Sequence, residues 1–263
     1  ANTDGDFPAK SLRPKTRIDN YRVAIDARNV SVKGMSENSL AWLLEAGVKP
    51  SRLSIFTDEE EHLDKLKRDE KLKGISLVLA KSAEQLWANY RENTCLTVIP
   101  AHLKKPDILN TTLAKDDELE DEDEVGGVID TADFNDFYRQ LVYPVFHVLR
   151  ENSCYLASFN GENRGWAIGN FTAIHGMYSA VVRHDKELFG GRAKRLKPMT
   201  DKDSFNLSLN HFKKDGRTAR ISLFRLRYQS SAYRHPDASV LFVIPSYKRY
   251  EAVKEKTLSF LKS

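Results

Sequence analysis

The segment YRVAIDARNVSVKGMSENSLAWLLEAGVKPSRLSIFTD, residues 21–58, decides the expected fold. It opens with YRVAIDA, a short apolar run that contains an acid near its end, which is typical of a buried parallel strand reaching the functional edge of a sheet. Residues 37–46 then place three leucines at helical spacing, and residues 52–57, RLSIFT, give a second apolar run followed by Asp58. The segment therefore predicts a strand, a helix and a second strand.

The same alternation continues to residue 99. Further apolar runs at 74–80, GISLVLA, and 94–99, TCLTVI, are separated from their neighbours by helical patterns. Ser36 and Ser82 are candidate N-caps, and Gly47 is a candidate helix stop. Four strand–helix alternations in about eighty residues are the signature of a parallel, helix-covered sheet. We therefore expect an α/β protein with a Rossmann-like, mainly parallel sheet, helices on both faces and a C-terminal antiparallel strand pair.

The rest of the chain is expected to complete one domain, residues 21–263, behind a flexible N-terminal arm, residues 1–20. Alternation at residues 217–228 and an apolar run at 238–244 predict the antiparallel pair. The remaining expectations are an acidic inserted loop at about 101–125, a strand at 125–130, a helix at 136–150, a strand at 153–159 and a Gly-rich, basic insertion at about 160–215.

Composition excludes several classes of protein. No run approaches the ~20 apolar residues that a membrane helix needs, and residues 1–10 show no apolar signal core. Cys95 and Cys154 lie inside apolar runs and are interpreted as buried thiols, and no Cys/His cluster has zinc spacing. We expect an intracellular protein, cytoplasmic or nuclear, with no membrane segment, no secretion and no structural metal.

Charge is unevenly distributed along the chain. Residues 116–124 hold eight acids in nine positions, whereas residues 183–227 hold thirteen Lys or Arg against five Asp or Glu. Basic groups with interleaved aromatics are typical of a track for nucleic-acid phosphates, although a solvated strand face gives the same pattern. The candidate substrate-binding residues are Arg192, Lys194, Arg195, Lys213, Lys214 and Arg217.

The order of elements over residues 20–245 resembles that of the class I S-adenosylmethionine-dependent methyltransferases. In that family the first strand ends in an acid and runs into a loop under the cofactor, and the second strand ends in an acid that binds the ribose hydroxyls. A residue after the third strand pairs with the adenine. The resemblance implies S-adenosylmethionine as cofactor, bound by Asp26, Arg28, Asn29, Gly34, Asp58, Lys81 and Ser82.

After its fourth strand the family carries a catalytic or substrate-facing motif. Two stretches compete for that place, residues 99–101 and residues 130–134, and we favour the second because a helix and a strand follow it. Asp130 and Asp133 would then orient a nucleophile or act as a base. The alternative for Asp133 is an N-cap of the following helix.

Two functions follow from these observations. The first is a divergent S-adenosylmethionine-dependent methyltransferase acting on a nucleic acid. The second is a catalytically inactive protein of the same fold that binds nucleic acid or serves as a scaffold. It is favoured by Arg28, Asn29 and Val30, which stand where a cofactor loop would carry glycines.

Overall fold

A computed structural model describes residues 17–28, 35–109, 131–159, 177–185, 188, 201–221 and 224–226. The first half follows the expected alternation. It runs β1 (Arg22–Asp26), α1 (Ser39–Glu45), β2 (Leu53–Thr57), α2 (Glu60–Lys67), β3 (Ser76–Leu79), α3 (Ala83–Ala88) and β4 (Cys95–Pro100). The prediction of four alternating strands and helices is confirmed.

A seven-stranded sheet with the order β3-β2-β1-β4-β8-β7-β9 forms the centre of the molecule. Its later strands are β7 (Leu156–Phe159), β8 (Tyr178–Val181) and β9 (Ala219–Ile221). Strands β1, β2, β3 and β4 pair in parallel, and β7 pairs in parallel with β9. The exception is β8, which runs antiparallel to both β4 and β7. The mainly parallel, Rossmann-like sheet with an antiparallel pair in the C-terminal half of the chain is therefore confirmed.

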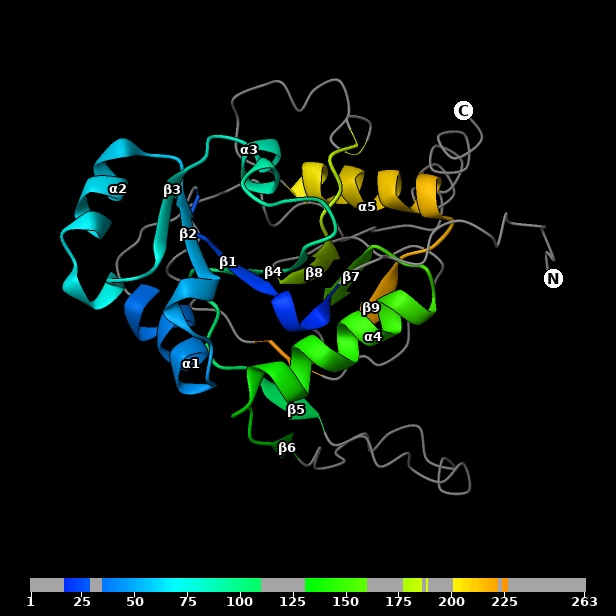
Figure 1. Cartoon of the computed structure of the whole chain (residues 1–263), viewed down its shortest axis with the longest axis horizontal. Helices are drawn as coiled ribbons and strands as arrows, with labels where there is room; N and C mark the ends of the chain where they lie inside the picture. The colour runs from blue at the N-terminus through cyan, green and yellow to red at the C-terminus, as the bar shows by residue number, and fades with distance from the viewer. Residues whose placement is uncertain are drawn as a thin grey trace, which may run out of the picture.

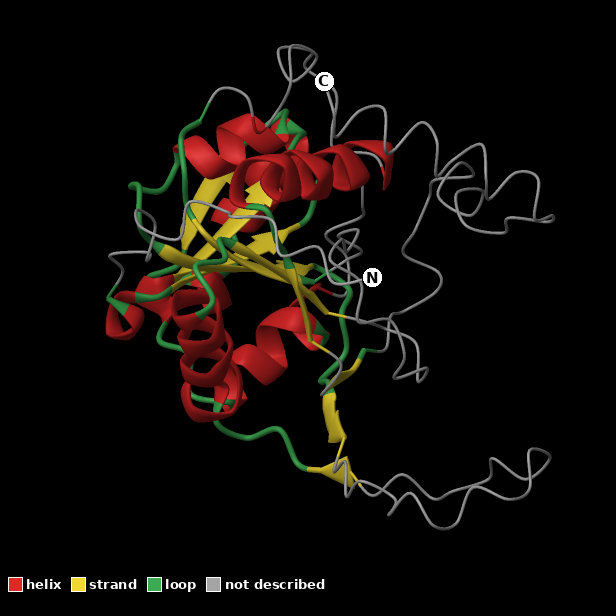
Figure 2. Cartoon of the chain, turned by 90° about the vertical axis from the view of Figure 1, so that its right-hand side faces the viewer, coloured by secondary structure: helices red, strands yellow, loops and turns green. Residues whose placement is uncertain are grey.

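Helices cover both faces of this sheet (Figure 2). In Figure 1, α1 and α4 (Tyr143–Glu151) lie on one side, and α3 and α5 (Asp201–Asp215) lie on the other. Burial along β1 follows from this arrangement. Val23 and Ile25 belong to the apolar core under α1 and α4, whereas Ala24 belongs to the opposite core, which also holds Trp87. Alternate residues of one strand thus serve two cores, as expected for a strand buried on both faces.

Two of the three expected helix signals are confirmed. The Ser82 hydroxyl accepts a hydrogen bond of 3.2 Å from the Gln85 N–H and caps α3. Gly47, with φ of +84°, follows the end of α1, and its N–H donates to the Leu44 carbonyl. The Ser36 prediction is wrong, because a 3-10 turn, Met35–Glu37, precedes α1 and places Asn38 at the N-cap position.

The second half departs from the predicted layout in several places, one of which is the helix α5, found where a Gly-rich and basic insertion was expected. Tyr178–Val181, expected within a Gly-rich and basic insertion, is β8 and lies between β4 and β7. Residues 217–228, expected as one long strand, divide into β9 and β10 (Phe224–Arg225). The latter belongs to a separate three-stranded sheet with β5 (Asp107–Leu109) and β6 (Thr131–Ala132). The expected partner strand at 238–244, the strand at 125–130 and the acidic run at 116–124 lie outside the described residues.

The helix expected at residues 136–150 begins with a π-helical segment, Tyr138–Val142, that continues into α4. Pro144 has no N–H to donate to the carbonyl four residues earlier. The Tyr143 N–H bonds the Tyr138 carbonyl, five residues earlier, which is the π-helical spacing. Next to Pro144 the helix therefore contains a widened turn rather than a break.

Candidate functional site

The carboxyl ends of the parallel strands form the edge where an open α/β sheet binds its ligand. The chain crosses from β3 back to β4, so β1 is flanked by β2 on one side and β4 on the other. Asp26 ends β1, level with Phe56 of β2 and Pro100 of β4, and Asp58 follows β2 directly. Asp26 thus borders the point between β1 and β4 where the strand order reverses, and Asp58 lies at the same edge one strand away.

Asp26 is held by Arg28. The guanidinium donates from Nε to Oδ1 at 2.8 Å and from Nη2 to Oδ2 at 2.7 Å, and the Arg28 backbone N–H adds a third bond of 3.1 Å to Oδ1. The Arg28 side chain is only 3% exposed, against 25% for Asp26. A bidentate, charge-assisted pair of this kind has a fixed geometry. The carboxylate of Asp26 therefore serves first to fix Arg28.

The remaining guanidinium nitrogen of Arg28, Nη1, is buried and has no hydrogen-bond partner. Burial by itself would lower the pKa of Arg28, but the Asp26 carboxylate outweighs that effect and raises it, with a smaller contribution from Asp58. Arg28 therefore stays charged. A buried charged donor without an acceptor is costly, so this nitrogen marks a place where an anionic acceptor would be stabilised.

Tyr178 of β8 adds a phenol to the same edge. Its ring stacks on Trp87 at a centroid distance of 6.3 Å, and burial, followed by the Asp26 charge, raises the pKa of its hydroxyl. The phenol is therefore neutral and can take part only as a hydrogen-bonding group. Tyr178 is not among the cofactor-binding candidates of the sequence analysis, because its strand was expected to belong to an insertion.

Lys81 and Ser82 follow β3 at the same edge. The Lys81 side chain is exposed, and its backbone N–H donates to the Gln85 side chain at 2.5 Å. The Ser82 hydroxyl is already engaged as the cap of α3. Of this pair, Lys81 has the more accessible side chain. The other cofactor-binding candidates, Asn29 and Gly34, lie outside the described residues.

Asp133 lies away from this edge. Its carboxylate pairs with Lys105 at 3.0 Å, and Lys105 also reaches Glu45 at the end of α1. The start of α1 is held at the carboxyl edge, where the Ser39 hydroxyl donates to the Ala101 carbonyl. Since α1 extends ~10 Å from one end to the other, Asp133 and Asp26 lie at opposite ends of this helix.

The N-cap alternative for Asp133 is wrong. Asp136 takes that role, accepting from the Arg139 N–H at 3.0 Å, while the Gln140 side chain accepts from two further N–H groups of the same turn. The other catalytic candidate, Asp130, lies outside the described residues.

Residues 99–101, the competing stretch, do lie at the carboxyl edge. Pro100 pairs with Asp26 in the sheet, and the Ala101 N–H donates to the Asp26 carbonyl at 3.0 Å. His102 follows and is 3% exposed. The sequence signal for a site at residues 99–102 is their position directly after a central strand. Residues 130–134 were favoured instead because a helix and a strand follow them.

The described basic candidates lie at the opposite, amino-terminal edge of the sheet. Thr218 and Ala219 continue from Arg217 into β9, and Ala219 pairs with Ala157 near the start of β7. Lys214 contacts Asp185 at 2.9 Å, within a network in which Arg183 also binds Asp185 and Asp215. Lys213, Lys214 and Arg217 are exposed but far along the strands from Asp26 and Asp58. Arg192, Lys194 and Arg195 lie outside the described residues.

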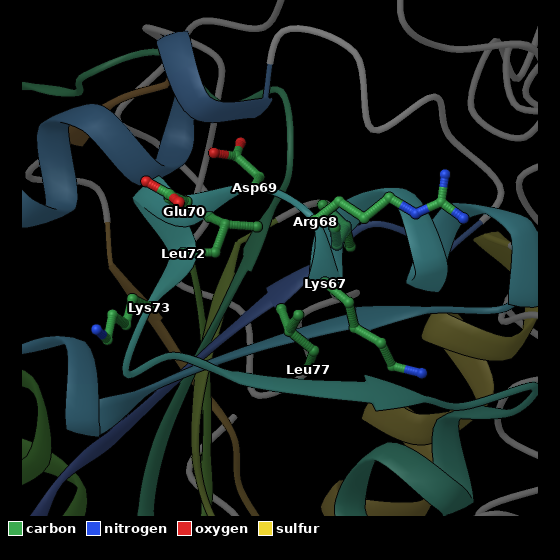
Figure 3. Close-up of a pocket in the computed structure, with 8 residues that line it drawn as sticks. Lys67, Arg68, Asp69, Glu70, Leu72, Lys73 and Leu77 are labelled. Atoms are coloured by element: carbon green, nitrogen blue, oxygen red, sulfur yellow. The ribbon is translucent and has the colours of Figure 1, made fainter.

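A shallow hollow of about 250 Å³ lies beside the edge strand β3 (Figure 3). It is lined by the end of α2, the following 3-10 turn and Leu77, and its charged side chains are of mixed sign. All of the lining residues except Leu77, which lies within β3, precede that strand, so the hollow is not part of the carboxyl edge. Within the described ranges, no group of three or more His, Cys, Asp or Glu could hold a metal ion. Nor does any helix found there have the length and apolar character to cross a membrane.

Both expected thiols are buried, and neither forms a disulfide. Burial raises the pKa of Cys154 to about 11, so its thiolate, the nucleophilic form, is scarce near neutral pH.

Comparison with models of known protein families and with curated proteins finds no match to this chain.

Proposed function

We propose that the chain binds S-adenosylmethionine at the carboxyl edge of its sheet and acts as a divergent methyltransferase on nucleic acid. The single observation that carries the proposal is the buried Nη1 of Arg28, which has no acceptor at the point where the strand order reverses. The cofactor has a carboxylate that would supply this acceptor. Asp58, at the end of β2, would accept hydrogen bonds from its ribose diol.

The residues at this edge have different roles in the proposed site. Asp26 fixes the guanidinium of Arg28 through two side-chain bonds, so Asp26 is a positioning residue rather than a direct ligand. Lys81, exposed after β3, would lie beside the adenine. Bound S-adenosylmethionine would supply an electrophilic methyl group, and the described residues at the edge would bind and orient it.

Titration calorimetry with S-adenosylmethionine and with its demethylated product tests the proposal. We expect micromolar binding that weakens at least tenfold in Asp58→Asn, which keeps the size of the side chain and removes its charge. Asp64→Asn is the matched control, because Asp64 is exposed on α2 and pairs only with Lys67 there. Absence of binding at millimolar ligand would overturn the cofactor site.

A second function, a cofactor-free protein that binds nucleic acid or serves as a scaffold, is favoured by the closure of Asp26 onto Arg28. All three hydrogen bonds from Arg28 converge on this carboxylate, which leaves less of it for a ligand. This function predicts binding to oligonucleotides that weakens steeply with salt and does not change when S-adenosylmethionine is added.

A further inference from the structure

A row of aromatic rings runs along the outer side of the helix that contains the π-helical segment. Tyr138 and Tyr143 have ring centroids 6.3 Å apart, and Tyr143 stacks on His147 at 5.8 Å with an angle of 8° between the ring planes. At the inner end, Tyr21 lies 5.8 Å from Tyr138. We call Tyr138, Tyr143 and His147 the aromatic row.

The π-helical segment creates this row. In an α-helix, residues five apart point in directions that differ by about 140°, so Tyr138 and Tyr143 would lie on different faces. The wider turn, with its hydrogen bond from the Tyr143 N–H to the Tyr138 carbonyl, brings the two rings onto one face. Such turns are frequently found at functional sites. His147 then follows Tyr143 at the ordinary spacing of four residues.

The aromatic row is open to solvent in its middle. Tyr143 is 51% exposed. It is one of three large apolar side chains that are exposed among the described residues, the others being Leu44 on α1 and Val148 on another face of α4. Parallel rings at 5.8 Å are offset rather than eclipsed, so each leaves part of its face uncovered.

Arginines flank the aromatic row on both sides. Arg150 donates from Nη2 to His147 Nδ1 at 3.1 Å, and Arg139 is 85% exposed beside Tyr138 in the chain. Their nearest carboxylates, Glu151 and Asp136, are 3.6 Å away, in surface pairs that contribute little and can be exchanged for another anion.

We propose that the aromatic row is a binding surface for single-stranded nucleic acid, with bases stacked on Tyr143 and its neighbours and phosphates bound by Arg139 and Arg150. Every base has a π-face, so aromatic rings bind a single strand whatever its sequence, and flanking arginines follow the backbone. A base-paired strand keeps its bases stacked on one another and offers no free face. The surface should therefore prefer single strands over duplexes.

This proposal concerns the nucleic-acid partner of the proposed function but does not need the cofactor. Its residues, Tyr138, Tyr143 and His147, belong to the helix at residues 138–151 and are not among the basic candidates of the sequence analysis. Its test is done without S-adenosylmethionine, so a failure of the cofactor site and a failure of the aromatic row are distinguishable.

Fluorescence anisotropy with a labelled 12-nucleotide single strand, and with the matching duplex, measures the interaction over a salt series. Stacking of a base on an aromatic ring contributes about 1–3 kcal/mol to the binding free energy. A change of about 1.4 kcal/mol corresponds to a tenfold change in affinity. We expect Tyr143→Ala to weaken single-strand binding roughly 5- to 30-fold, the lower part of that range, because neighbouring rings partly cover Tyr143. Tyr143→Phe, which keeps the ring, should bind within twofold of the wild type.

Matched controls show whether a loss of binding is specific to the aromatic row or follows from removing any exposed apolar or arginine side chain. Leu44→Ala removes an exposed apolar side chain from α1, and Arg68→Gln removes an exposed arginine from the end of α2. Both should bind as the wild type does, whereas Arg139→Gln should weaken binding and lower the dependence on salt. Equal binding of strand and duplex, or unchanged affinity in Tyr143→Ala, would overturn the proposal. So would loss of self-association in Tyr143→Ala without loss of strand binding, because that result identifies an interface between copies of the chain.

Discussion

Removing the Arg28 guanidinium tests how strongly the carboxyl edge depends on the Asp26–Arg28 pair. In Arg28→Met the side chain keeps most of its length, but Asp26 loses both of its guanidinium bonds. Breaking a buried ion pair from one side costs about 3–5 kcal/mol. We expect the lower end, about 3 kcal/mol, because Asp26 is a quarter exposed and water can reach its carboxylate.

One effect works in the opposite direction. The variant also removes Nη1, a buried donor without a partner. Its removal raises the free energy of unfolding by about 1 kcal/mol. The net loss of unfolding free energy is then about 2 kcal/mol. At about 2–4 °C per kcal/mol for a domain of this size, Tm should fall by roughly 4–8 °C, measured by circular dichroism at pH 7.

Arg17→Met is the matched control. Arg17 and Asp19 have the same spacing of two residues, but both side chains are more than half exposed, so Tm should change by no more than about 1 °C. The double variant Asp26→Asn, Arg28→Met removes both charges and should be more stable than Arg28→Met alone. A fall in Tm for Arg28→Met no larger than that of the control would refute the account of the buried pair.

Two further predictions concern stability. His211 is fully buried, with Nδ1 2.9 Å from the Leu207 carbonyl, and burial lowers its pKa to about 4. The unfolded state takes up this proton near pH 6.5 and the folded state only near pH 4, so stability is lost as pH falls between these values, by about 2 kcal/mol at pH 5. Urea unfolding at pH 8 and pH 5 measures this loss, and an undiminished loss in His211→Leu would show that another group titrates. Gly47→Ala should cost about 1 kcal/mol at pH 8, because φ is +84° there and no atom lies within 4 Å of the added Cβ to clash with it; a neutral result would mean that the turn adjusts freely.

The first half of the fold was predictable because its signals are local. Each strand from β1 to β4 is a short apolar run, and Gly47 and Ser82 mark helix ends through their own backbone and hydroxyl chemistry. Burial on both faces of a parallel sheet explains why the runs of β1, β2 and β4 are continuous. The expectation of a Rossmann-like sheet depended on these signals and is confirmed.

The second half was less predictable because its decisive contacts are distant in sequence. Strand β8 is a short apolar run set between Gly-rich and basic segments, and it pairs with β4, more than seventy residues earlier. The composition around residues 178–181 predicted an insertion, whereas in the structure this segment is the strand that pairs with β4. The aromatic row was also not predictable from residue spacing. Tyr138 and Tyr143 are five residues apart and share a face only across a π-helical turn.

The candidate site was predicted in part. The acids at the ends of β1 and β2 could be identified from sequence, since parallel strands bring their carboxyl ends to one edge. That Arg28 would fold back onto Asp26 could not, because a spacing of two residues gives many geometries, as the exposed Arg17–Asp19 pair shows. The placement of Asp133 at the far end of α1 depended on Lys105 and Glu45, which no motif connects.

We propose that Arg28 and Asp58 form the binding edge for S-adenosylmethionine. Calorimetric titration of the wild type, Asp58→Asn and the Asp64→Asn control measures it most directly. We predict micromolar binding in the wild type and the control, and a loss of affinity of at least tenfold in Asp58→Asn. No heat at millimolar S-adenosylmethionine in the wild type, or equal affinity in all three proteins, would contradict it.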